Sequence, residues 1–375
     1  MTIAECVGDA LQLWFKINKI IKPPTVSQFR HAEYDPAKHF TSKVDKILAS
    51  TASVGPPDIS SHPSSVLSTL SSFQHVTVSE IYKLIRRAPC KHCPLDPVPT
   101  WLVKRAADVL APVITTICNA SLQSGCFPDF YKQARVTARQ KKPSLNPDDL
   151  NSFRSISNLP FLSKIIERVV VKQFIHHADQ NGLLLVRQSA YRRSHSTESA
   201  VLVVHNIVRA IDDGHVAALA LLDHSSAFDS VDHSTLLSIL RSRFSVTEQP
   251  LEWFRSYLTG RTQVFTTHSG QTHPIPLTPG VPQGSSLGPA QFISYTECTT
   301  NIFSLHSVQY DMFAVDTQSY SYCAMSEMTS PKPMLLCDFK STRRKPSSSG
   351  SVRFTRQLDQ NTTVLSINSR LWVCN

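Results

Sequence analysis

The order of the predicted elements indicates an α+β fold with an antiparallel sheet. Three segments of the first half carry apolar residues at helical spacing. A short, continuous apolar run follows at 216–222, and two candidate hairpins follow that run. Repeated strand–helix–strand units, which favour a parallel sheet, do not occur in this order. Helices therefore come first along the chain and paired strands later.

Composition limits the class of protein. The chain has 375 residues, of which 41% are hydrophobic, enough to form a core. Lys and Arg number 38 against 28 Asp and Glu, and the formal charge of +10 favours an acidic partner such as nucleic acid. Nine cysteines in this length do not indicate a disulfide framework, so we expect an intracellular setting, nucleus or cytoplasm. No run approaches the ~18 apolar residues of a membrane span, so we expect no membrane partner.

One cysteine pair has zinc-ligand spacing. Cys90 and Cys93 are two residues apart with His92 between them, but no second Cys or His pair lies at a suitable distance. A partly buried loop is the alternative interpretation, and it is the one that we favour.

The first half is predicted to be a weakly structured segment and then helices. Residues 1–76 include a Ser/Pro-rich linker at 49–72 and one short helix at 39–48. Order is expected from Thr77, because Thr77 and Glu80 have the spacing of a capping box. Two further helices are predicted, one with Pro112 in its first turn and its end at Gly125, the other at 163–179. A basic stretch, 135–142, lies between them.

The second half is predicted to supply the strands. The run 216–222 has the pattern of a central strand that is buried on both faces, and it ends at Asp223. Asp232 is expected to cap the next helix. Hairpins are predicted around Ser269-Gly270 and within 308–322, and residues 280–289 form a loop rich in Gly and Pro.

Asp223 is the first candidate for chemistry. A carboxylate at the end of a buried strand is held rigidly, which suits a ligand of Mg²⁺, an ion that prefers hard oxygen donors and substrate phosphates. A strand-end Asp that caps the following helix is the alternative, and position alone does not separate the two.

Several motifs occur together in one order. They are Asp223 followed by Phe228-Asp229, the loop Gly-Val-Pro-Gln-Gly-Ser at 280–285, and Ala-Val-Asp-Thr-Gln at 314–318. Flanking phrases extend the match: Cys-Pro-Leu-Asp-Pro at 93–97, Lys-Pro-Ser-Leu at 142–145, Ile-Ser-Asn-Leu-Pro at 156–160, His-Ser-Thr-Glu at 195–198 and Trp-Phe-Arg-Ser-Tyr-Leu at 253–258. Over roughly residues 75–325 the chain resembles the reverse-transcriptase region of non-LTR (LINE-type) retrotransposons.

The resemblance implies a right-hand polymerase fold. Residues 77–215 would be a fingers-like helical region and residues 216–330 the palm, with an antiparallel palm sheet that carries the catalytic motifs. Residues 331–375 do not resemble the family's continuation into the thumb. We expect them to be unrelated sequence or a disordered basic tail, with the thumb missing and no upstream endonuclease domain.

The resemblance also implies RNA-directed DNA polymerase activity, a nucleotidyltransferase reaction with an RNA template, a DNA primer and dNTP as partners. Two Mg²⁺ ions would be the cofactors, and Asp223 and Asp316 match the family's metal-binding catalytic carboxylates. Phe228 matches the bulky residue that crowds a ribose 2′-hydroxyl.

Three further residues match nucleotide-binding positions. Gln283 and Gly284 match the loop that packs near the template and the incoming nucleotide. Arg154 matches a fingers arginine near the triphosphate, where a bidentate donor is apt. A surface salt bridge is the alternative role for Arg154.

One site residue departs from the family pattern. The family has Tyr-Ala-Asp-Asp-Thr-Gln where this chain has Phe-Ala-Val-Asp-Thr-Gln at 313–318, so Val315 stands in place of the first Asp. Valine supplies no oxygen ligand, and Asp316, on strand alternation, points away from the position of Val315. We expect the hairpin to fold and catalysis to be impaired.

Other departures agree with sequence drift. Ala190, Arg193 and Ser194 stand where the family usually has Gly, Pro and Gly, and Ser155 stands where it has Pro. Ala290-Gln291 replaces an apolar pair in a helix that is expected to be buried.

Three functions are therefore open. The first is an impaired, truncated reverse transcriptase that still binds nucleic acid. The second is an active RNA-directed DNA polymerase that uses Asp223, Asp316 and another oxygen ligand. The third is a non-catalytic RNA-binding module.

Overall fold

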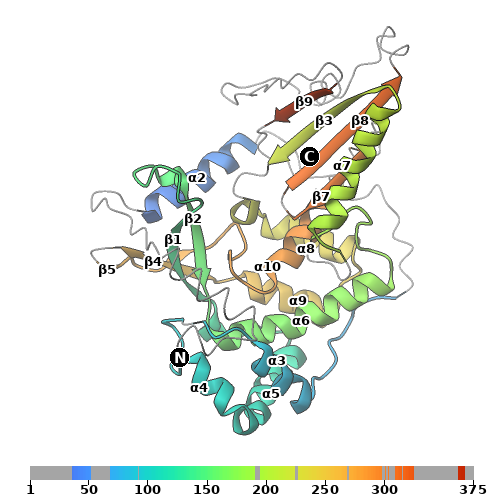
Figure 1. The fold of residues 1–375 in the computed structure, drawn as a ribbon. Helices are drawn as coiled ribbons and strands as arrows, with labels where there is room; N and C mark the ends of the chain where they lie inside the picture. Colours follow the sequence, from blue (N-terminus) through green and yellow to red (C-terminus); the bar gives the residue numbers. More distant parts are fainter. Residues whose placement is uncertain are drawn as a thin grey trace, which may run out of the picture.

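The computed structural model places two sheets around a group of central helices (Figure 1). It describes residues 36–51, 68–91, 93–190, 195–223, 227–267, 270–297, 300, 303, 309–314, 316–324 and 362–367. Residues 52–67 of the Ser/Pro-rich linker predicted at 49–72 lie outside the described residues, as does most of the predicted tail after residue 331.

The predicted capping box is present at the start of α3 (Val78–Arg87). The Glu80 amide donates to the Thr77 hydroxyl at 3.3 Å, and the Thr77 amide donates to the Glu80 carboxylate at 3.1 Å. Two amides that α3 itself cannot pair are satisfied in this way, so the helix begins where the sequence predicts.

The second predicted helix is longer than expected. Helix α4 (Thr100–Arg105) precedes α5 (Ala107–Ser124), so α5 begins at Ala107 and Pro112 lies inside it. The predicted start at Pro112 is wrong, because α5 begins five residues earlier and accommodates a proline that lacks the amide for a helical hydrogen bond. The predicted end is correct, since Gly125 follows in a left-handed conformation (φ 65°). Helix α6 (Phe161–Gln180) covers the third predicted segment.

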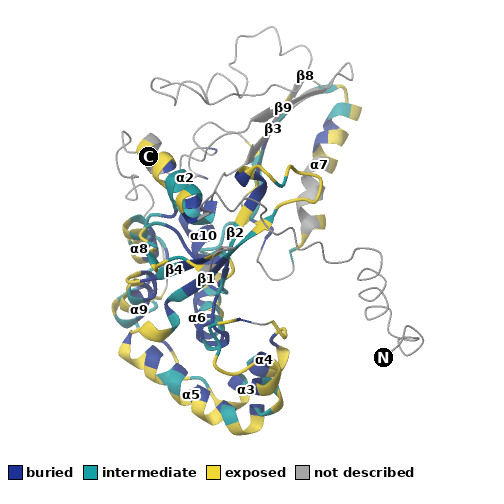
Figure 2. Ribbon diagram, turned by 90° about the vertical axis from the view of Figure 1, so that its left-hand side faces the viewer, coloured by how far each residue is buried: buried dark blue, intermediate teal, exposed yellow. Residues whose placement is uncertain are grey.

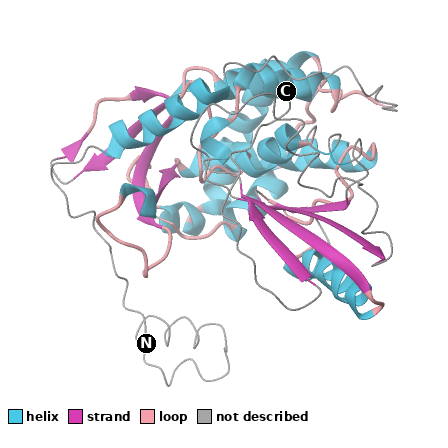
Figure 3. Cartoon of the chain, turned by 90° about the horizontal axis from the view of Figure 1, so that it is seen from above, coloured by secondary structure: helices cyan, strands magenta, loops and turns pink. Residues whose placement is uncertain are grey.

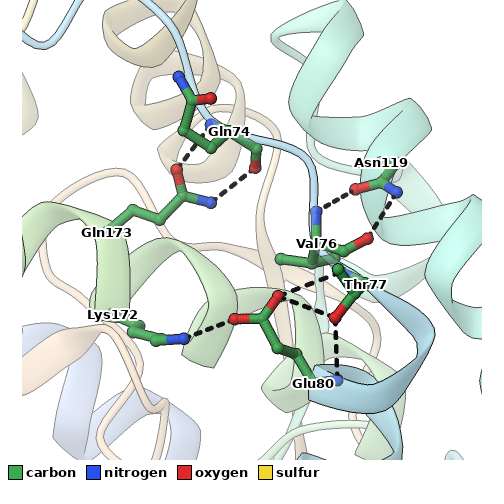
Figure 4. Close-up of polar contacts among 7 residues, drawn as sticks. All are labelled: Gln74, Val76, Thr77, Glu80, Asn119, Lys172 and Gln173. Atoms are coloured by element: carbon green, nitrogen blue, oxygen red, sulfur yellow. Dashed lines mark hydrogen bonds and ion pairs between the residues drawn. The ribbon is translucent and has the colours of Figure 1, made fainter.

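The chain before α3 is tied to α5 and α6 (Figure 4). The Gln173 side chain of α6 bonds the Gln74 backbone in both directions, at 2.8 and 2.9 Å. Asn119 of α5 does the same for Val76, at 2.8 and 3.0 Å. Helix α2 (Pro36–Thr51) lies earlier still; it contains the short helix predicted at 39–48 and extends beyond it at both ends.

The first sheet has five strands: β1 (Gln133–Gln140), β2 (Phe153–Asn158), β4 (Thr262–Thr267), β5 (Gly270–Gln271) and β6 (Ile275–Pro276). Strand β4 pairs with β5 and β6 in antiparallel fashion, which confirms the first predicted hairpin. Strands β1 and β2 are antiparallel, but β1 and β4 are parallel. The basic stretch 135–142 is therefore mostly strand.

The second sheet has the order β7-β8-β3-β9. Its strands are β3 (His215–Asp223), β7 (Gln309–Phe313), β8 (Asp316–Ala324) and β9 (Thr362–Ile367). Strand β3 lies between two neighbours, as its apolar run predicts, and β7 and β8 form the second predicted hairpin.

The prediction of an antiparallel sheet needs correction. Strand β9 pairs with β3 in parallel, and the first sheet also contains a parallel pair, so both sheets are mixed. The sequence analysis predicted no element after residue 331, whereas Thr362–Ile367 is a strand rich in β-branched residues.

Helices cover the sheets and fill the centre. Helix α7 (Thr197–Asp212) lies along one face of the second sheet (Figure 3), where Ile207 packs with Tyr320. Helices α8 (His233–Ser242), α9 (Glu248–Leu258) and α10 (Gly288–Thr296) join α5 and α6 in the main core. Figure 2 shows α6 and α10 as largely buried. The predicted cap of α8 is confirmed, since Asp232 accepts from the Thr235 amide at 2.7 Å.

Helix α10 contains a buried polar residue, as the departure at 290–291 predicts. Gln291 is 1% exposed, and neither its amide nitrogen nor its amide oxygen has a hydrogen-bond partner. Such an unpaired group destabilises a core, so this substitution weakens the helix that underlies the 280–289 loop.

Candidate active site

Asp223 and Asp316 lie directly opposite each other across the β3–β8 ladder. Asp223 is the last residue of β3, and Asp316 is the first residue of β8. Opposed residues of an antiparallel pair point to the same face with Cβ atoms about 4.5–5.5 Å apart. The register therefore places residues 223 and 316 side by side at one end of the second sheet.

The turn before Asp316 is a two-residue connection. Phe313 and Asp316 are register partners, so Ala314 and Val315 span the gap between β7 and β8. Ala314 has a positive φ of 56°, a left-handed conformation that is uncommon for a residue with a Cβ. Val315 lies outside the described residues.

Phe228 joins the Asp223 segment to the 280–289 loop. Its half-buried ring lies 5.2 Å from the ring of Phe292 in α10. Its carbonyl accepts from the Val281 amide at 2.8 Å. Gly280 has a φ of 95°, and a Cβ there would lie 2.9 Å from the Asp229 carbonyl oxygen. Only glycine fits this close approach.

The 280–289 loop also lies against β2. The Ser157 amide donates to the Gln283 carbonyl at 2.8 Å. Gly284 has a φ of 132°, and a Cβ there would lie 2.4 Å from the Ser157 carbonyl oxygen. Gln283 is half-buried and Gly284 is exposed, so the loop tip is held by β2 while its outer surface remains accessible.

Arg154 lies on β2 with an exposed side chain, and it makes no hydrogen bond or ion pair within the described residues. The salt-bridge alternative is therefore not supported there. Its register partner on β1 is Arg139, and Arg135 lies four residues before Arg139 on the same face. We call Arg135, Arg139 and Arg154 the basic face. Like charges directly opposite each other repel, so the Arg139–Arg154 pair favours an anion between them.

Sequence reasoning missed Glu167, a residue of α6 whose carboxylate holds the 280–289 loop by a hydrogen bond. This fully buried carboxylate of α6 accepts from the Ser286 amide at 2.5 Å and from the Ser163 hydroxyl at 2.8 Å. Burial raises its pKa, while nearby Arg261 and these hydrogen bonds oppose the rise. The only sequence signal was a polar residue inside the apolar stripe of α6.

A small cavity of about 140 Å³ opens beside Gly284. Its lining includes Lys91, Lys164 and Arg168 as cations and Asp96 as an acid. Asp96 accepts from the Phe161 amide at 2.7 Å, and burial lowers the pKa of Lys164. Basic side chains outnumber acidic ones in the lining next to the loop, although burial disfavours the charged form of Lys164.

The zinc interpretation gains no support. Cys90 is exposed, Cys93 is buried, and both are free thiols, while His92 lies outside the described residues. Within the described ranges no group of three or more His, Cys, Asp or Glu could hold a metal ion. Nor does any helix in these ranges combine the length and apolar character required to cross a membrane.

Residues 140–322 match the family model described as reverse transcriptase (RNA-dependent DNA polymerase). The chain contains a reverse-transcriptase domain. This domain includes β2, β3, the 280–289 loop and the β7–β8 hairpin, and all of the predicted site residues, Phe228 after β3 among them, lie within it.

The chain, over this domain and the sequence beside it, is similar to proteins of insect non-LTR retrotransposons. It is 31% identical over 219 residues to the RNA-directed DNA polymerase from mobile element jockey of Drosophila melanogaster. It is 30% identical over 228 residues to the probable RNA-directed DNA polymerase from transposon BS of the same species. These alignments cover 58% and 59% of this chain but 24% of each relative, so the chain spans about a quarter of their length.

Proposed function

We propose that the second sheet is a polymerase palm and that the domain derives from an RNA-directed DNA polymerase. The observation that carries this proposal is the register pair of Asp223 and Asp316 at the sheet end. On this proposal, the first sheet and helices α3–α6 form the fingers. The RNA template, DNA primer and dNTP would meet between the two sheets.

The donor set at the sheet end fits a divalent cation. Mg²⁺ in phosphoryl-transfer sites is usually held by one or two carboxylates together with substrate phosphates, and the register pair of Asp223 and Asp316 would supply two carboxylates. When bound, such ions neutralise charge that develops on the attacking and leaving oxygens. Two carboxylates are enough to bind one Mg²⁺ ion, but they leave few protein ligands for a second.

We infer that Val315 impairs this site. A carboxylate at position 315 would add about one negative charge beside Asp316, and valine adds none. Water can complete the shell of an ion, but it does not replace that charge or fix the separation of two ions. The remaining pair therefore gives metal binding with weakened catalysis.

Other residues of the chain would orient the substrates. Phe228, held against Phe292, would exclude a ribose 2′-hydroxyl and so select deoxynucleotides. Gln283 and Gly284 would contact the template and the incoming nucleotide from a loop fixed to β2. Arg154 would bind the triphosphate, since a guanidinium pairs with phosphate oxygens in a bidentate manner.

Primer extension on an RNA template with Mg²⁺ tests this proposal. We expect Val315→Asp to raise extension at least about 100-fold, since loss of even an outer-shell partner of a metal costs 10–100-fold. Asp223→Ala in that background is the control and should abolish extension. Activity of the unmodified chain equal to that of Val315→Asp would refute impairment.

A gel-shift salt series separates catalysis from binding. The basic face predicts RNA binding that weakens steeply with salt, whether or not Val315 is changed. If Val315→Asp gives no extension while binding persists, the domain acts as a nucleic-acid-binding module.

A further inference from the structure

Gln188 lies beside the hairpin that carries Asp316. It is 2% exposed, and the segment around it pairs with β7 in parallel through a bridge between Gln188 and Met312. The Met312 amide donates to the Arg187 carbonyl, and the Ser189 amide donates to the Met312 carbonyl, both at 2.8 Å. Residues 187–189 therefore form an extra edge on the hairpin.

The Gln188 side chain reaches the turn itself. Its Oε1 accepts from the Ala314 amide and from the Ala190 amide, each at 3.0 Å. Its Nε2 lies 3.5 Å from the Ala314 carbonyl oxygen, at the long limit of a hydrogen bond. Both ends of the amide thus meet the backbone of one turn residue.

Ala314 is the residue that needs such support. Its left-handed backbone is disfavoured by the Cβ, and such conformations persist where surrounding contacts fix them. The backbone pairing of β7 with β8 ends at Phe313 and Asp316, so the strand ladder itself does not include Ala314. The amide of Gln188 is therefore a contact that fixes the conformation of the turn two residues before Asp316.

Burial alone does not give a glutamine side chain hydrogen bonds in this fold, as a second buried glutamine shows. Gln291 is as buried as Gln188, and neither of its polar atoms has a partner. The bonds of Gln188 are specific to the turn, and Gln291 offers a matched control for loss of a buried glutamine.

We propose that Gln188 is a positioning residue, which holds Ala314 in its left-handed conformation and so keeps Asp316 opposite Asp223. The part of this inference that concerns metal binding rests on the proposed function, because it takes the two aspartates as the metal ligands. The clamp on the turn does not depend on that assignment.

The first experiment measures the turn directly by hydrogen exchange of the Ala314 amide in the full chain. Gln188→Met removes the acceptor at similar volume and should speed exchange about 10-fold or more. Gln188→Glu keeps an acceptor oxygen and should exchange near the unmodified rate, while Gln291→Met should leave it unchanged. Equal exchange in Gln188→Met and the unmodified chain would overturn the proposal.

The second experiment measures Mn²⁺ affinity by electron paramagnetic resonance. Gln188→Met should weaken binding about 10-fold or more, in the range seen for outer-shell partners of metal ligands. Adding Ala314→Gly should restore part of the loss, because glycine adopts a positive φ without support. A purely structural role for Gln188 would not give this rescue.

The two experiments distinguish the two ways to fail. If Asp223→Ala leaves Mn²⁺ binding unchanged, the aspartate pair is not the metal site, and exchange at Ala314 alone decides the role of Gln188. If Asp223→Ala abolishes binding but Gln188→Met does not weaken it, Gln188 does not position the site. Should Gln188→Met fail to fold, Gln188→Asn, whose amide is one methylene further from Ala314, serves in its place.

Discussion

Replacement of Gly284 by alanine tests how tightly the 280–289 loop is fixed to β2. The added Cβ would lie 2.4 Å from the Ser157 carbonyl oxygen, well inside contact distance, and the residue has a φ of 132°. Backbone strain of this kind costs about 1–3 kcal/mol. Relief of the clash requires the loop to withdraw from β2, which breaks the bond between Ser157 and Gln283 and costs a further ~0.5–1.5 kcal/mol.

We therefore expect Gly284→Ala to lower the free energy of unfolding by about 2–4 kcal/mol, measured by urea denaturation. Gly260→Ala is the matched control, because Gly260 also has a positive φ (71°) but nothing lies within 4 Å of its added Cβ. The control should lose only the conformational part, about 1–2 kcal/mol. If Gly284→Ala costs no more than Gly260→Ala, the loop does not depend on its close approach to Ser157.

Three further changes test charge and burial. Burial raises the pKa of Asp229 from 3.8 to about 6, so the folded state holds this proton more tightly than the unfolded state. Its contribution to stability is full below about pH 4 and falls by about 3 kcal/mol as the pH rises above 6, and Asp229→Asn should flatten this slope in urea titrations. Arg139→Gln and Arg154→Gln should each reduce the salt dependence of RNA binding by about one phosphate contact, whereas Arg105→Gln on α4 should not; equal slopes would exclude the basic face. Gln291→Leu removes two unpaired polar atoms and should raise the unfolding free energy by about 1–3 kcal/mol; a loss of stability would contradict the unpaired state of the amide.

Local signals in the sequence gave correct elements where short-range chemistry decides them. The capping box at Thr77, the cap at Asp232 and the stop at Gly125 involve neighbours within a few residues. The apolar run that ends at Asp223 likewise predicted a central strand from its own composition. These features need no knowledge of distant contacts.

Contacts between distant segments were not predictable in the same way. Glu167 bonds a loop that lies 119 residues later, and Gln188 bonds a turn 126 residues later. Arg139 becomes the partner of Arg154 only through the register of β1 and β2. The parallel pairing of β1 with β4 also joins strands that no local pattern connects. Resemblance to a family identified the motif residues and the segment that begins at Gln188, but it assigned no role to Glu167 or Arg139 and did not give the contact of Gln188 with Ala314.

The register of the hairpin changes how Val315 is understood. Residue 316 is the register partner of residue 223, so the backbone holds this pair together whatever the residue at position 315. The bonds that shape the turn come from Gln188 to the backbone of Ala314, and none of them uses the side chain at 315. Valine is also favourable in strands, so we expect the hairpin to fold with it. A carboxylate restored at 315 would then join a turn that is already shaped, and the effect of Val315→Asp should appear in catalysis and metal affinity while the unfolding free energy changes little.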